Sequence, residues 1–87
     1  MVAHWGAHQM DRTAVDHVTQ AILGQIKLEL RNAASIAAAA EVCGGAGNVK
    51  AAVKMAMDLE DPAFRADRLL QALLLIRREL LDDDLPD

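Results

Sequence analysis

The sequence predicts an all-α fold of three main helices (long, short, long), packed as a helical bundle that we expect homodimerisation to complete. Two observations predict it. The 87 residues are rich in Ala and Leu and contain no Tyr, one Phe and one Trp, a composition that favours helix over strand. Apolar residues also recur at helical spacing in three segments separated by turn residues. We assign residues 1–10 to a flexible arm, 11–82 to one helical domain and 83–87 to an acidic tail.

The first long helix is predicted from about residue 13 to 43, with Asp11 or Thr13 as its cap. Its apolar stripe has a period closer to 3.6 than to 3.5 residues, which does not imply a long supercoil. Asn32 offers an alternative break, because Asn can cap a new helix. A rod of this length, about 46 Å, overhangs a compact domain of this size and favours a dimer. The predicted stripe consists of Val15, Val18, Ile22, Ile26, Leu30, Ala33, Ala37 and Ala40.

A glycine-rich turn is expected over residues 44–47, because Gly suits the left-handed position that follows a helix end. Asn48 should then cap a short helix over about 49–60. Asp61 and Pro62 should open the last helix, which runs to Leu81, because Asp is a favoured cap and Pro fits the first helical turn.

The last helix is the most informative element. Its apolar arc is roughly 160° wide, whereas about 100° suffices for one buried face. A helix this apolar needs more than one neighbour, in its own chain or in another. We therefore predict a protein interface made by Phe64, Leu69, Leu70, Leu73, Leu74, Leu75, Ile76 and Leu80.

Two charged residues fall inside these apolar surfaces. Glu29 lies in the stripe of the first helix and Arg77 in the arc of the last. Each is costly alone in a core and much less so when paired. We predict that they, or their copies in a dimer, form a buried ion pair that sets the register. The alternative is that both lie at the rim and reach water.

The segment around 37–57 has the outline of a degenerate helix-turn-helix, with a Gly-rich turn and a second helix that would enter the major groove. Asn48, Lys50 and Lys54 would then face DNA. The turn holds three glycines, however, and the net charge is −4, which argues against a partner held through its phosphates. The competing interpretation is a hinge between packed helices.

A metal site is a further hypothesis. His4 and His8 have the i, i+4 spacing that lets two imidazoles on a helix share one ion, although Gly6 lies between them. If Met1 is removed, His4 becomes the third residue, and an amino-terminal Val-Ala-His can chelate Cu²⁺ or Ni²⁺ in square-planar geometry. Such binding would be incidental to any chain that begins this way.

Other chemistry is weakly indicated. Cys43 lies at a helix C-terminus, where the dipole disfavours a thiolate. The Gly-rich loop follows a helix and lacks the Lys-Ser/Thr pair of phosphate-binding loops. With one Cys, no signal peptide and no apolar run near 18 residues, we expect a cytoplasmic protein with no cofactor and no membrane or nucleic-acid partner. The abundance of Ala, Leu, Asp and Arg suggests a bacterial source.

The sequence thus predicts a small non-enzymatic interaction or assembly protein that acts through an apolar helix surface, with a second copy, or alternatively another protein, as its partner. Two alternatives remain. One is the DNA-binding regulator described above. The other is an accessory subunit or adaptor of a larger complex, which would leave an apolar patch exposed on the isolated protein.

Overall fold

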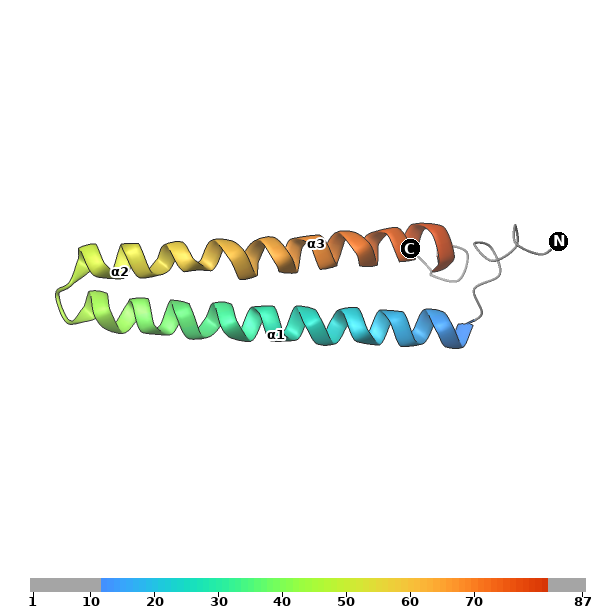
Figure 1. Cartoon of the computed structure of the whole chain (residues 1–87), viewed down its shortest axis with the longest axis horizontal. Helices are drawn as coiled ribbons and strands as arrows, with labels where there is room; N and C mark the ends of the chain where they lie inside the picture. The colour runs from blue at the N-terminus through green and yellow to red at the C-terminus, as the bar shows by residue number, and fades with distance from the viewer. Residues whose placement is uncertain (1–11, 82–87) are drawn as a thin grey trace.

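The computed structural model describes residues 12–81, which form an antiparallel hairpin of two long helical arms (Figure 1). The first arm is α1 (Arg12–Gly45). The return arm consists of α2 (Val49–Ala56), the 3₁₀ turn η2 (Met57–Leu59), α3 (Glu60–Ile76) and a final π-helical turn, η3 (Arg77–Leu81).

The all-α prediction is confirmed, since the described residues are helical apart from the short turn and contain no strand. The prediction of three main helices is wrong, because the second and third are joined into one bent helix. The predicted arm at 1–10 and tail at 83–87 lie outside the described residues.

The first arm is one continuous helix, as predicted, and does not break at Asn32. It ends two residues later than expected, at Gly45. At 1.5 Å per residue, its 34 residues span about 51 Å. The length of this arm sets the length of the hairpin.

The turn between the arms combines a helix stop with a helix start. Gly47 has φ +96° and donates its N–H to the Gly44 carbonyl, while the Asn48 N–H donates to the Cys43 carbonyl. This pair of bonds is the Schellman arrangement, in which a left-handed Gly ends a helix. The Asn48 side chain then accepts the N–H of Ala51 at 3.3 Å and caps α2. The predicted glycine turn and Asn cap are both confirmed.

Pro62 bends the return arm without breaking it. Its ring disfavours an ordinary α turn ahead of it, and Pro62 has no N–H to donate to the Asp58 carbonyl four residues earlier. The backbone before it forms the tighter 3₁₀ turn η2, in which the Glu60 N–H donates to the Met57 carbonyl. Leu59, at the position before α3, stays right-handed with φ −68° and ψ −21°, and no side chain caps the helix. Asp61 therefore lies inside the first turn of α3 and is not the predicted cap.

The residues of α1 that the return arm covers alternate at spacings of four and three. This is a 3.5-residue period, typical of two helices that pack along their whole length. The predicted 3.6-residue stripe is therefore wrong in part: Val18, Leu30 and Ala37 are exposed. The covered row, which we call the α1 seam, is Val15, Thr19, Ile22, Ile26, Glu29, Ala33, Ile36, Ala40 and Cys43.

The return arm has a matching seam with one irregularity. Its spacing alternates between four and three except at 56–59–62, where two steps of three follow each other. A 3₁₀ helix has three residues per turn, and η2 lies at this step. The tight turn thus keeps both halves of the arm in contact with α1. The return seam is Ala52, Ala56, Leu59, Pro62, Ala66, Leu69, Leu73, Ile76 and Leu80.

Gly24 lies in the middle of α1, and a Cβ added there would meet nothing within 4 Å. Gly24→Ala should therefore raise the free energy of unfolding by about 0.5–1 kcal/mol, because Gly costs backbone entropy in a helix interior. Thermal unfolding followed by circular dichroism should show a melting temperature higher by about 2–8 °C. Gly47→Ala is the control of opposite sign, since its φ of +96° disfavours any side chain. A lower melting temperature for Gly24→Ala would contradict the continuous helix.

Candidate interaction surface

The seam between the two arms buries little apolar surface. Val15, at 4% exposure, and Pro62 are the only apolar residues among 12–81 that are buried, and no described side chain is less than 2% exposed. Much of the seam is alanine, especially in α2 and the half of α1 beside it, and alanine buries little area. Much of the larger apolar area of the hairpin therefore lies outside its own seam.

The clearest concentration of that area is a group of four leucines, which we call the leucine face: Leu23, Leu30, Leu70 and Leu74. Their exposures are 43%, 54%, 48% and 45%. Each follows a seam residue by one position along the chain. One residue further along a helix lies about 100° around its axis. Because the two arms run in opposite directions, this rotation turns the leucines of both arms toward the same side of the seam. The four leucines therefore share one face of the hairpin.

The register of the two arms places these leucines close together. The Arg65 Nε donates to the Glu29 Oε2 at 2.9 Å, so Glu29 and Arg65 lie at the same level. Counting from this pair, Leu70 lies near the level of Leu23, with Leu74 and Leu30 on either side. The leucine face is thus about 15 Å long at 1.5 Å per residue.

The same surface continues toward the turn. Val53 and Met57 follow the seam residues Ala52 and Ala56, and both are 55% exposed. Between them and the leucines, the positions one after the seam hold small side chains, at Ala37 and Ala63, and one charged side chain, Glu60, which follows Leu59. This side of the hairpin thus carries six large exposed apolar side chains, with charged residues between and beyond them.

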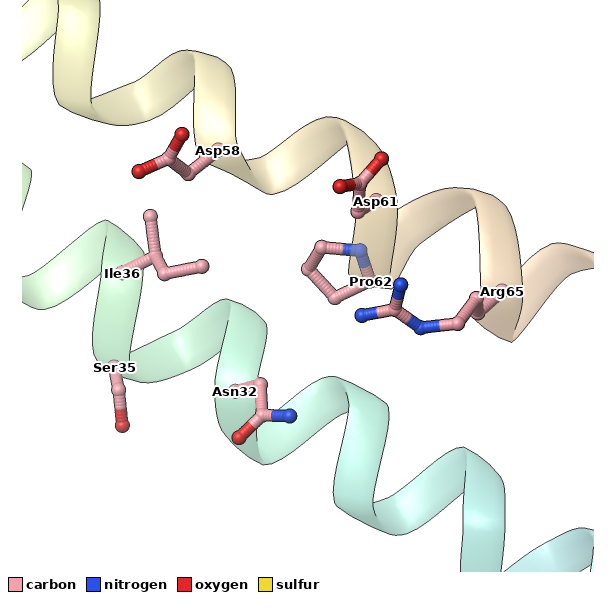
Figure 2. Close-up of a pocket in the computed structure, with 7 residues that line it drawn as sticks. All are labelled: Asn32, Ser35, Ile36, Asp58, Asp61, Pro62 and Arg65. Atoms are coloured by element: carbon pink, nitrogen blue, oxygen red, sulfur yellow. The ribbon is translucent and has the colours of Figure 1, made fainter.

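The opposite side of the hairpin differs, because an open and partly polar groove of about 380 Å³ lies there (Figure 2). Asp58 and Asp61 border it on the return arm, while Ile36 and Pro62 supply apolar contacts. The residues that line it are Asn32, Ser35, Ile36, Asp58, Asp61, Pro62 and Arg65.

The predicted interface residues divide between two roles. Leu69, Leu73, Ile76 and Leu80 are half-buried in the return seam, against α1. Leu70 and Leu74 are exposed on the leucine face. Leu75 is 51% exposed and precedes a seam residue, which places it on the groove side.

Phe64 is 60% exposed, and the Arg68 guanidinium lies 5.6 Å from its ring centroid. The prediction omitted Leu23 and assigned Leu30 to the internal stripe. A 3.5-residue reading of the first helix would have found both, since each follows a seam position.

Glu29 is buried, as a residue in the apolar stripe should be, but its partner within the chain is Arg65 and not the predicted Arg77. Arg77 is exposed and lies 12 positions further along the return arm, about 18 Å away from Arg65. A pair between copies of the chain stays a prediction. The second carboxylate oxygen of Glu29 is buried and accepts no hydrogen bond from the described residues.

The residues of the DNA-binding hypothesis lie at the turn end of the hairpin. Asn48 serves as the cap of α2, and Lys50 and Lys54 are exposed. The helices α1 and α2 run side by side in opposite directions (Figure 1), whereas a helix-turn-helix crosses at about 90–120°. This geometry gives the DNA-binding alternative no support.

The metal hypothesis falls on His4 and His8, which lie outside the described residues. Within residues 12–81, no three His, Cys, Asp or Glu side chains gather in a way that could hold a metal ion. Cys43 is partly buried, with its Sγ 3.7 Å from the Asn48 carbonyl oxygen. None of the described helices is both long enough and apolar enough to cross a membrane.

Comparison of the chain with protein-family models, with curated proteins and with solved structures gives no match.

Proposed function

We propose that this chain is a non-enzymatic interaction protein that assembles through its leucine face, with two hairpins forming a four-helix bundle. One observation carries the proposal: four half-exposed leucines lie together on one side of a hairpin in which only two described apolar residues, Val15 and Pro62, are buried. Contiguous exposed apolar patches on small proteins mark surfaces that another protein covers.

The energy available at this face decides what kind of assembly is expected. Burying a whole Leu side chain contributes about 1.5–3 kcal/mol, so each half-exposed Leu contributes roughly 1 kcal/mol more when covered. The eight leucines of a dimer then supply about 8 kcal/mol, against an association cost of about 4–15 kcal/mol. The remainder must come from Val53, Met57 and the flanking alanines. If the four copies of Val53 and Met57 add about 4 kcal/mol and the association cost is at the low end of its range, the net is about 8 kcal/mol, which corresponds to a micromolar dissociation constant.

The accessory-subunit alternative uses the same face with a helix of another protein in place of the second copy. We favour the second copy because another hairpin presents an identical leucine face. The two faces are then equal in length and can cover each other completely. A chain that stays monomeric at high concentration would contradict the self-assembly proposed here.

The experiment compares two double variants of the full chain. Leu23→Glu with Leu70→Glu places four charges in the proposed interface of a dimer. Leu28→Glu with Leu75→Glu is the matched control, because these leucines are equally exposed, at 49% and 51%, but precede seam residues and lie on the groove side. Sedimentation velocity gives the assembly state, and circular dichroism checks that each variant stays helical.

We expect the leucine-face variant to associate at least 100-fold more weakly than the unaltered chain, since the charges must be buried without partners. The groove-side variant should keep the mass of the unaltered chain. Equal loss of association in both variants, or loss in neither, would overturn the assignment of the face.

A further inference from the structure

We infer that the second copy docks in parallel, so that the twofold axis runs along the hairpin and the two turns lie at the same end of the bundle. The inference rests on the proposed function and adds the orientation of the partner. The charges that border the leucine face carry it.

Lys27 and Asp67 are the two charges that lie level with the middle of the leucine face, while Glu60 and Arg77 lie beyond its two ends. They lie at the same level, because Lys27 is two positions before Glu29 and Asp67 is two positions after Arg65. Both are exposed, and each follows a seam residue, Ile26 or Ala66. They therefore lie on the leucine side of the hairpin, at its two outer borders.

A second pair of opposite charges is arranged in the same way near the open end of the hairpin. Asp16 follows the seam residue Val15, and Arg77 follows Ile76. The register set by the Glu29–Arg65 contact brings Asp16 and Arg77 to within one residue of the same level. Both side chains are exposed.

A parallel twofold lays α1 of one hairpin against α3 of the second copy, level for level. Lys27 then faces Asp67 of the second copy, and Asp16 faces Arg77 of the second copy. Each pair occurs twice because of the symmetry. The leucines of α1 meet the leucines of α3 at the same time, so the apolar and charged contacts agree in one arrangement.

The antiparallel arrangement sets like charges together at two positions. There α1 packs against α1 of the second copy, and centring the leucine face on itself brings Lys27 toward its own counterpart and Asp67 toward its own. Arg77 comes toward Glu60 of the second copy, which is the one kind of opposite-charge contact that this orientation gains. The parallel dimer has two kinds of opposite-charge contact and neither of these like-charge contacts, so the antiparallel orientation is disfavoured.

Charge reversal in the full chain separates the two orientations. In the parallel dimer, Lys27→Glu alone or Asp67→Lys alone turns two attractive contacts into repulsive ones and should raise the dimer dissociation constant about 5- to 30-fold. The double variant restores opposite charges and should return the constant to within about threefold of the original value. In the antiparallel dimer, none of the three variants changes the sign of any contact.

A distance measurement gives the orientation directly. Cys43→Ser with Ala46→Cys allows one spin label at the turn of each hairpin, and the distance is measured by pulsed electron paramagnetic resonance. Parallel docking places the two labels at one end, about 20–30 Å apart. Antiparallel docking separates them by at least the length of α1, about 51 Å.

The outcomes distinguish the two proposals. A dimer with close labels and rescue by the double variant supports the parallel orientation. A dimer with distant labels and no response to charge reversal overturns the orientation and leaves the proposed function standing. A chain that forms no dimer overturns both.

Discussion

Replacing Arg65 by Met should lower the free energy of unfolding by about 1–3 kcal/mol, whereas replacing Glu29 by Leu should raise it by about 1–2 kcal/mol. The two partners of one ion pair thus give effects of opposite sign. The reason is their unequal burial. Glu29 lies in the seam, while half of the Arg65 side chain is in solvent.

Removing Arg65 leaves a carboxylate buried in the seam with neither oxygen bonded among the described residues. Removing Glu29 instead takes the buried charge away and fills the same space with an apolar side chain. The Arg65 side chain can then extend into the solvent, where its charge costs little. A buried ion pair is often worth less than a well-packed apolar replacement, and this site has the geometry for that outcome.

Chemical denaturation followed by circular dichroism measures both changes, at one protein concentration because the proposed dimer couples stability to concentration. Arg78→Met is the control, since its contact with Glu79 is exposed on both sides and should contribute little. If Glu29→Leu destabilised the protein as much as Arg65→Met, the pair would be a net source of stability and this interpretation would be wrong.

Gly44→Val should destabilise the hairpin by about 1–3 kcal/mol more than Gly45→Val does. A Cβ at Gly44 would lie 3.4 Å from the Cβ of Ala52, whereas a Cβ at Gly45 meets nothing within 4 Å. The first contact leaves room for one methyl group and none for the two that Val adds. The arms approach closely at this end because their seams are made of small residues.

The two glycines are adjacent in the last turn of α1, so the cost of a β-branched residue in a helix is nearly the same at both and cancels in the comparison. Gly44→Ala adds only the tolerated methyl and should be close to neutral or stabilising. Thermal unfolding of the three variants tests the expectation. Equal destabilisation by Val at both positions would show that the arms do not pack closely here.

Local chemistry was sufficient to predict the elements that depend on neighbouring residues. Gly47 and Asn48 end one helix and begin the next through bonds within a few residues, so the turn could be predicted from the sequence. Pro62 could not be interpreted so fully. Proline disfavours an ordinary α turn before it, but whether the chain then breaks or tightens depends on the surface it packs against, here α1.

The seam could not be predicted for a similar reason. Val18 and Leu30 are as apolar as the residues that line the seam, while Thr19 and Glu29 are less so, and the phase is decided by the second arm. The partner of Glu29 becomes visible only once the register of the arms is known. The last helix carries more apolar side chains than one seam covers, as predicted. Leu69 and Leu73 are half-buried against α1, whereas Leu70 and Leu74 are exposed.

Sedimentation equilibrium of the untagged full chain over a concentration series tests the central claim, that the leucine face is covered by a second copy. A mass rising from 9.4 kDa to twice that value between about 1 μM and 1 mM is expected for a micromolar dissociation constant. A helical chain that keeps the mass of one copy across the whole range would contradict it.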